Sequence, residues 1–248
     1  MKCCKVICFW FGWRRQFSNN VSNITELVPT IVNTELNIEN GIDTDVLFVV
    51  NKTNTELDNS LDKYDGMQTK NGCIKVIKRD NIGLSFGAYL TAFSQFKNEY
   101  DYWFFSEDDV IIYHENYMKS FVDFWEKNKE QLGFIALAPI SNYGKLHCGG
   151  GCGMVSTEWM KKTYNDSDII RILQNYSTYK EQYDIADSTL GSENAEVLFS
   201  SSFVHDGRTI MNHSEYSPLA ANYTKHNSQR RFETRENLNK KFIYTVGA

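Results

Sequence analysis

The segment from Tyr100 to Tyr117 reads YDYWFFSEDDVIIYHENY. Its first half is apolar and aromatic, which is typical of a strand buried in a sheet. Three adjacent carboxylates, Glu107-Asp108-Asp109, then interrupt the pattern, although they repel one another and are poor strand formers. Such a conflict between local rules is typical of a functional site. A carboxylate cluster at a strand end suits Mg²⁺ or Mn²⁺; the alternative is that Asp108 and Asp109 only cap or turn the chain.

The residues before this segment alternate between strand and helix patterns. We expect strands at 6–11, 45–50, 74–77 and 102–106, a helix at 22–37 that is interrupted or entered at Pro29, and a helix after Gly83. This order predicts βαβ units and therefore an α/β fold with a mostly parallel sheet flanked by helices. Ligands of such sheets bind beyond the carboxyl ends of the strands. Asn51, Arg79-Asp80-Asn81 and Glu107-Asp108-Asp109 all follow expected strands.

The second half is less regular. It predicts a helix at 117–128, a strand at 134–138, a flexible loop at 149–153 and a helix that begins near Ser192. No repeat or linker divides the chain, so we expect a single domain over 1–215. Residues 216–248 are polar and basic, and we expect them to form an extension packed on or near the domain.

Composition limits the function further. The chain has 248 residues, 42% of them hydrophobic, and a net charge of −5, which argues against a nucleic-acid binder. The apolar run from Val6 to Trp13 is short, bulky and followed by Arg14-Arg15, so it does not resemble a signal peptide. No run approaches the roughly 20 apolar residues of a membrane span. We therefore expect a soluble, cytoplasmic protein without a transmembrane segment.

Six cysteines are too few for a disulfide scaffold in a chain of this length. The segment HCGGGCG places His147, Cys148 and Cys152 close together and raises the alternative of a zinc site. A structural zinc site would need a second Cys/His pair at comparable spacing, and the sequence has none.

The segment FFSEDDVIIYHENYMKSFVDFW resembles the metal-binding segment of GT-A fold glycosyltransferases, in which an acidic DxD-type motif ends a central strand of a Rossmann-like sheet. It is similar to the N-acetylglucosaminyltransferase I variant, in which the last of three acids is the direct metal ligand. By this resemblance Asp109 binds the metal, Glu107 is a second candidate ligand, and Glu107 and Asp108 are oriented toward the sugar, the ribose or metal-bound waters. The chain has Glu-x-Asp where the motif has Asp-x-Asp.

The segment RDNIGLSFGAY resembles the part of family 2 type glycosyltransferases that follows the third strand and lies near the nucleotide. Asn51 stands where that family often has an acid that contacts the base. Glycine permits close approach of the backbone, and Arg79 can neutralise phosphate. The donor pocket implied by this resemblance consists of Phe11, Asn51, Arg79, Asp80, Asn81 and Gly83, together with Glu107 and Asp108.

Two later segments extend the resemblance. SENAEV is similar to the helix start that supplies the catalytic base of inverting enzymes, which points to Glu193, with Glu196 as the alternative. GGGCGMVSTEWM resembles the acceptor side, so the donor half covers about 1–115 and the acceptor half about 116–215. Some GT-A enzymes complete the metal shell with a C-terminal histidine. His205 or His213 could take this role, with surface or hydrogen-bonded histidines as the alternative.

These features imply a glycosyltransferase that moves a sugar from a nucleoside diphosphate donor to a hydroxyl of a glycan or related acceptor, with inversion and with Mn²⁺ or Mg²⁺ as cofactor. One alternative is a sugar-nucleotide nucleotidyltransferase. Such enzymes carry a Gly-rich loop after the first strand, whereas this chain has FWFGWRRQFSNN there, with one glycine. The other alternative is a non-catalytic carbohydrate-binding protein, since the 14% aromatic content suits sugar stacking as well as a core.

Overall fold

The structure is a computed structural model. It describes residues 1–11, 14–17, 20–108, 110–137, 140–142, 146–148, 151–174, 198–213 and 243–245. For 14–17, 20–27, 140–142, 171–174 and 243–245 only the backbone is described. The expected catalytic residues Glu193 and Glu196, and the expected metal ligand Asp109, lie outside the described residues.

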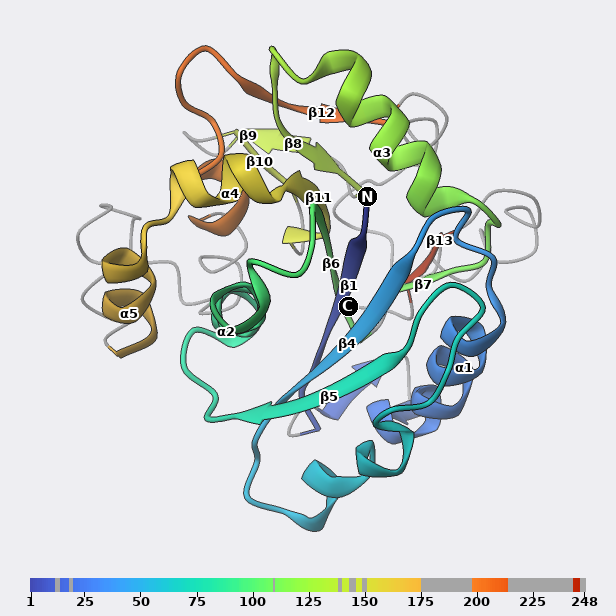
Figure 1. Ribbon diagram of the computed structural model, residues 1–248. Helices are drawn as coiled ribbons and strands as arrows, with labels where there is room; N and C mark the ends of the chain where they lie inside the picture. Colours follow the sequence, from blue (N-terminus) through green and yellow to red (C-terminus); the bar gives the residue numbers. More distant parts are fainter. Residues whose placement is uncertain are drawn as a thin grey trace.

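A seven-stranded sheet in the order β12-β8-β11-β6-β1-β4-β5 forms the centre of the molecule (Figure 1). Its strands are β1 (Cys3–Phe9), β4 (Thr44–Asn51), β5 (Ile74–Arg79), β6 (Tyr102–Glu107), β8 (Leu132–Ala136), β11 (Gly153–Ser156) and β12 (Thr209–Asn212). Only β11 runs antiparallel to its neighbours in this sheet. The expected α/β architecture, a mostly parallel sheet flanked by helices in one domain, is confirmed.

Helices cover both faces of this sheet (Figure 1). They are α1 (Ile24–Asn37), α2 (Leu84–Phe96), α3 (Tyr117–Asn128), α4 (Thr157–Thr163) and α5 (Asp166–Gln174). Alternate residues of β6 point to opposite faces. Phe105 therefore packs on Tyr89 of α2, at 4.8 Å between ring centroids, while Phe104 packs on Phe121 of α3 at 5.2 Å. Both halves of the core are thus aromatic, and β6 is buried between them.

Short elements complete the chain. They are β2 (Arg14–Phe17), β3 (Asn20–Asn23), β7 (Val110–Ile112), β9 (Ile140–Asn142), β10 (Leu146–Cys148), β13 (Ile243–Thr245) and the 3₁₀ turns at Glu56–Asn59 and Asp62–Tyr64. β13 pairs with β7, so part of the C-terminal segment returns to the sheet domain beside the acidic motif. No helix in the described part of the chain combines the length and apolar character that crossing a membrane requires.

Several expected element boundaries were wrong, and three of these differences are described here. The first strand begins at Cys3 rather than Val6, because Lys5 is fully buried and forms an ion pair with Glu35 of α1. The helix at α1 neither begins nor breaks at Pro29, which falls in its second turn. The strand expected at 134–138 begins at Leu132, because Leu132 is fully buried and pairs with Thr209 of β12.

Candidate functional site

The candidate site lies at the carboxyl edge of the sheet, where β6, β1, β4 and β5 end side by side. These four strands are parallel, so their last residues meet at one edge. The register places Glu107 opposite Cys8, and Asn51 opposite Arg79. The polar residues that follow three expected strands therefore meet at this edge.

The acidic segment is anchored to the chain that follows β1. The Oδ2 atom of Asp108 accepts a hydrogen bond from the backbone N–H of Trp10 at 2.9 Å, and Asp108 is only 8% exposed. Glu107, the last residue of β6, is half-buried. The carboxylate of Asp108 thus fixes the end of β6 against the end of β1, and its neighbour Glu107 is partly open to solvent.

The thiol of Cys8 lies close to the charged groups of this edge. Burial raises the pKa of its thiol well above the ordinary value, and the nearby carboxylates of Asp108 and Glu107 raise it further. The guanidinium of Arg79 acts in the opposite direction on the same thiol. The thiol therefore remains neutral at physiological pH. Both acids and the arginine lie within electrostatic reach of this one buried atom.

Arg79 is held by neutral oxygen atoms. Its Nη1 donates to Oδ1 of Asn51, and its Nη2 donates to the carbonyl oxygen of Ile82. The amide nitrogen of Asn51 donates to the Sγ atom of Cys8 at 3.3 Å and to the carbonyl oxygen of Leu84 at 3.2 Å. We call this set of contacts, which joins Cys8, Asn51, Arg79, Ile82 and Leu84, the Asn51–Arg79 network.

A tight turn leads from Arg79 into α2. Gly83 has φ +74° and Leu84 has φ +51°, so two successive residues adopt the left-handed conformation that glycine favours. Asp80 is exposed and pairs with Lys52 at 3.3 Å. The Oδ1 atom of Asn81 is buried and has no hydrogen-bond partner within the described chain. This turn places the N-terminus of α2 beside Arg79.

Two residues that support this edge were missed by sequence reasoning. A Cβ atom at Gly87 would lie 1.9 Å from the carbonyl oxygen of Ile82 and 2.7 Å from Nη2 of Arg79, so only glycine fits under the turn. Asp58 accepts hydrogen bonds from the backbone N–H groups of Thr53, at 2.9 Å, and Asn54, at 2.8 Å. Burial acts to raise the pKa of Asp58, but these hydrogen bonds outweigh it and lower the pKa. No sequence motif marks Gly87 or Asp58, because the roles of both residues depend on tertiary contacts.

Two other expected site residues pack against neighbouring side chains. Phe11 is buried in the core against Phe9, with ring centroids 6.1 Å apart, rather than open to a ligand. His213 follows β12, three strand spacings or roughly 14 Å from β6. Its Nε2 atom lies 3.1 Å from Oγ of Ser120 on α3. The histidine is therefore at the carboxyl edge, and it packs on α3.

His205 precedes β12 and lies at the amino edge, because β12 runs parallel to β8 and β8 runs in the same direction as β6. Its ring stacks on Trp159 of α4, with centroids 4.4 Å apart, and its Nε2 lies 3.0 Å from Oγ1 of Thr163. Asp206 pairs with Lys162 there at 2.9 Å. The structure therefore does not bring His205 to the acidic segment.

Comparisons with known proteins add solved structures of low similarity. No protein-family model matches the chain, and no curated protein matches it. TarS of S. aureus in complex with UDP matches at a TM-score of 0.36 and 16% identity, over 57% of this chain and 36% of the TarS chain. The match thus spans about a third of the TarS chain.

Two further solved structures match over more of their own length. HddC from Yersinia pseudotuberculosis, complexed with GMP-PN, matches at a TM-score of 0.39 and 11% identity, over 66% of this chain and 80% of HddC. The galactosyltransferase LgtC, in complex with donor and acceptor sugar analogues, matches at a TM-score of 0.47 and 11% identity, over 98% of this chain and 86% of LgtC. These similarities are too low to assign a family, and the fold described above rests on its own strand order and register.

Proposed function

We propose that this protein is a metal-dependent glycosyltransferase that transfers a sugar from a nucleoside diphosphate sugar to a hydroxyl group of a glycan or related acceptor, with inversion. One observation carries this function: the acidic end of β6 and the Asn51–Arg79 network occupy the same edge of the parallel sheet. A diphosphate donor needs oxygen ligands for a cation and a positive charge for its phosphates. Both lie at this edge.

The residues at this edge fit a hard divalent cation. Mg²⁺ and Mn²⁺ prefer oxygen ligands, and Mg²⁺ is commonly held by one or two carboxylates while waters and substrate phosphates fill the remaining positions. Glu107 and Asp108 supply carboxylates of this kind, and the resemblance in sequence adds Asp109 as the direct ligand. When bound, such an ion would act as a Lewis acid and offset charge on the departing diphosphate.

Other residues of the chain would bind and orient the reactants. Arg79 supplies a positive charge near the diphosphate, and the turn at Gly83 presents backbone N–H groups of the first turn of α2. Glu193 would accept the proton of the acceptor hydroxyl as it attacks the anomeric carbon, with Glu196 as the alternative base. The roles of both glutamates rest on the sequence, because they lie outside the described residues.

A panel of nucleotide sugars tests this function. Melting temperatures would be measured with uridine, guanosine and adenosine diphosphate sugars, with and without Mn²⁺, because a ligand of the folded state raises apparent stability. We expect one base class to raise the melting temperature only when Mn²⁺ is present. The same donor should release nucleoside diphosphate when a suitable acceptor is added. If none of these donors shifts the melting temperature, the proposed function is wrong.

Matched variants connect the result to the acidic segment. Glu107→Gln should remove the Mn²⁺-dependent shift, whereas Glu99→Gln, which changes the same residue type at the amino edge, should keep it. The two alternatives give other outcomes. A nucleotidyltransferase would be stabilised by a nucleoside triphosphate and would release diphosphate from it. A non-catalytic carbohydrate-binding protein would be stabilised by free glycans without any dependence on nucleotide or metal.

A further inference from the structure

The partners of Arg79 are unusual for a buried cation. Arg79 is 9% exposed, yet its guanidinium donates only to an amide oxygen and a backbone carbonyl oxygen among its described contacts. No carboxylate of the described residues lies within ion-pair distance of it. The adjacent acid, Asp80, is directed to Lys52, and its side chain is 79% exposed. Burial lowers the pKa of Arg79, but a guanidinium remains charged at any physiological pH.

Asn51 is the residue that makes this arrangement possible. A carboxamide has one acceptor oxygen and two N–H groups. In Asn51, which is 1% exposed, the oxygen accepts from Arg79, and the nitrogen donates to Leu84 and Cys8. An aspartate could accept from Arg79 but could not donate to the carbonyl oxygen of Leu84. Leucine could do neither. Only a carboxamide of this length fixes the guanidinium and the start of α2 together.

The neutrality of the Asn51 side chain matters as much as its hydrogen bonds. A carboxylate at this position would form an ion pair with Arg79 and cancel most of its field at the carboxyl edge. A neutral amide holds the same guanidinium but leaves its positive charge in force. Because the site is largely shielded from water, that charge acts at an effective dielectric constant well below that of bulk water.

We infer that Asn51 is a positioning and specificity-determining residue, which holds Arg79 in place without neutralising it and so keeps one buried positive charge for a nucleoside diphosphate. This inference rests on the proposed function. It goes further by assigning Asn51 an indirect role in recognition of the phosphates: the side chain is fully engaged inside the protein and acts on the ligand through Arg79.

Binding of phosphate esters that differ in charge provides the test. Titration calorimetry in Mn²⁺ would use UDP, GDP and ADP, each compared with its monophosphate, on the wild type and on Asn51→Asp. We expect Asn51→Asp to weaken binding of the preferred diphosphate by tenfold or more, because one charge neutralised within a few ångströms of the phosphates, at an effective dielectric constant of about 20, is worth more than a factor of ten. The loss should be smaller for the monophosphate, because that ligand carries less charge.

A second pair of variants keeps the test decisive if Asn51→Asp does not fold. Arg79→Met removes the charge and should reproduce the larger loss for the diphosphate, while Arg79→Lys keeps the charge and should restore part of the preference. Lys78→Met is the matched control. It removes a cation from the preceding residue of β5, which pairs with Asp62 at 2.6 Å outside this site, and should leave both affinities unchanged.

The outcomes separate this inference from the proposed function. If the wild type binds none of the three diphosphates, the proposed function and the inference fail together. If the wild type binds one of them and Asn51→Asp weakens the diphosphate and its monophosphate by the same factor, Asn51 has only a structural role and the inference alone is wrong. A larger loss for the diphosphate in both Asn51→Asp and Arg79→Met supports it.

Discussion

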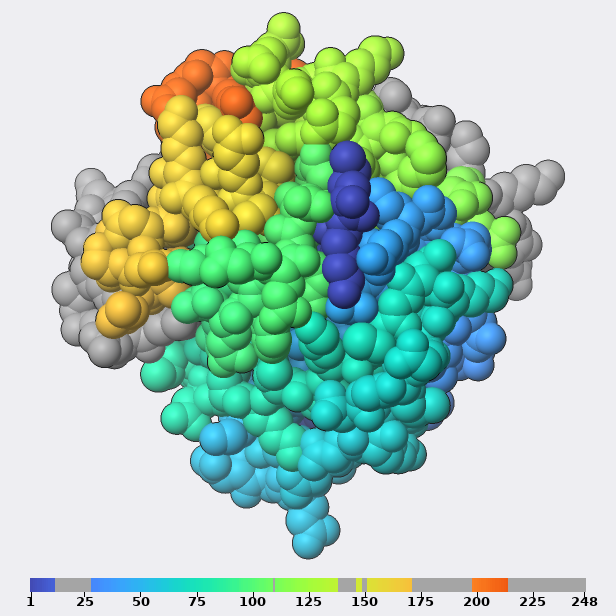
Figure 2. Space-filling view, viewed as in Figure 1, coloured from blue at the N-terminus to red at the C-terminus, as the bar shows by residue number. Residues whose placement is uncertain are grey.

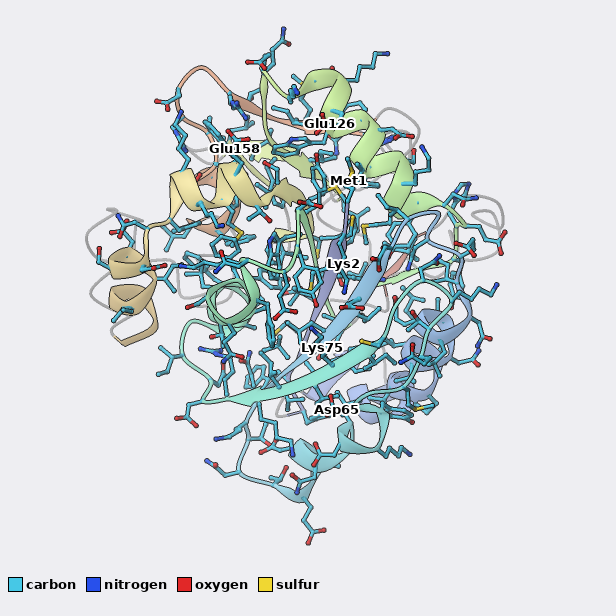
Figure 3. The ribbon with its side chains drawn as sticks, viewed as in Figure 1. Met1, Lys2, Asp65, Lys75, Glu126 and Glu158 are labelled. Atoms are coloured by element: carbon cyan, nitrogen blue, oxygen red, sulfur yellow. The ribbon has the colours of Figure 1, made fainter. Side chains whose placement is uncertain are left out.

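The two edges of the central sheet hold their charged groups in different ways. At the amino edge, Asp45 is buried and meets opposite charge: Lys2 lies 2.8 Å and Lys75 lies 3.8 Å from its Oδ2 atom. The hydroxyl of Tyr100 and the backbone N–H of Cys73 also donate to it, at 2.8 and 3.0 Å. Figure 3 labels Met1, Lys2 and Lys75 in this region. We call Asp45, Lys2, Lys75 and Tyr100 the amino-edge cluster.

At the carboxyl edge, the buried Arg79 is held by neutral dipoles, whereas the exposed Asp80 pairs with Lys52. Asp108 accepts from a backbone N–H, and Arg79 donates to amide and carbonyl oxygens. Paired charges largely cancel at a distance, whereas charges held by dipoles retain a field that a ligand can use. Under the proposed function, we expect the amino-edge cluster to contribute to stability and the charge of Arg79 at the carboxyl edge to contribute to ligand binding.

Neighbouring segments flank the amino end of β1. In Figure 2 the first residues of the chain, in dark blue, lie on the visible surface between light-blue and green segments from later in the sequence. Backbone hydrogen bonds join these segments. Cys3 donates to Asp43 and Asp101 donates to Lys2, each at 2.8 Å. Strand β1 is thus joined to the loops before β4 and β6 at its amino end.

The largest effect is expected from the acid that the sequence assigns as metal ligand. Asp109→Asn keeps the shape of the side chain but removes its charge, so donor turnover with Mn²⁺ should fall by about 10²-fold or more while the melting temperature stays near that of the wild type. Steady-state kinetics and thermal unfolding would measure both. Asp101→Asn, one residue before the amino end of β6, is the control. Equal activity in the two variants would contradict the assignment of Asp109.

Gly87→Ala should destabilise the carboxyl edge by about 1–3 kcal/mol, because the new methyl group would overlap the carbonyl oxygen of Ile82. The sign of the change in unfolding free energy is informative, since alanine stabilises an uncrowded helical position by about 1 kcal/mol relative to glycine. Urea unfolding would give the free energy. Gly66→Ala measures the cost of backbone strain without crowding, because its φ is +78° and nothing lies within 4 Å of its Cβ position. Stabilisation by Gly87→Ala would show that the turn is not packed as described.

Asp45→Asn should cost about 1–2 kcal/mol of unfolding free energy at pH 7 and leave donor affinity unchanged. Burial acts to raise the pKa of Asp45, but Lys2, Tyr100 and the backbone of Cys73 outweigh it and lower the pKa. A lowered folded pKa means that the stabilisation is fully present above the unfolded value of about 3.9 and is lost as the pH falls through the folded pKa.

Urea unfolding of the wild type and Asp45→Asn between pH 2 and pH 7 would check this sign. The difference between the two proteins should be largest near neutral pH and should shrink below pH 4. A difference that is constant over the whole range would mean that Asp45 stabilises the fold by packing rather than by its charge. A change in donor affinity would contradict the claim that the amino edge has no part in donor binding.

Much of the fold could be predicted because its strands are buried on both faces. The runs at 46–50 and 102–105 are continuously apolar, and the helix Tyr117–Asn128 was predicted with its observed bounds. The start of β1 could not be predicted in the same way. Lys5 reads as a surface residue until Glu35 and Tyr117 are known to surround its ammonium group, and their positions depend on how α1 and α3 pack.

For the candidate site, the location of the residues could be predicted from the sequence, but their contacts could not. Asn51, Arg79 and Glu107 could be found because they follow strands, and parallel strands end at one edge by geometry alone. What each residue does there could not be predicted. That Asn51 engages all its hydrogen-bonding groups inside the protein, and that Phe11 turns into the core, depends on neighbours brought by distant parts of the chain.

Hydrogen–deuterium exchange with and without a nucleoside diphosphate and Mn²⁺ tests the difference between the edges most directly. Using the diphosphate that stabilises the wild type, we predict slower exchange at the carboxyl ends of β4, β5 and β6, in residues 51–58, 79–87 and 105–108. Exchange in the amino-edge segments 43–46, 72–75 and 99–102 should not change. Protection confined to the amino-edge segments would contradict the account, because the ligand would then bind at the edge where charges are already paired.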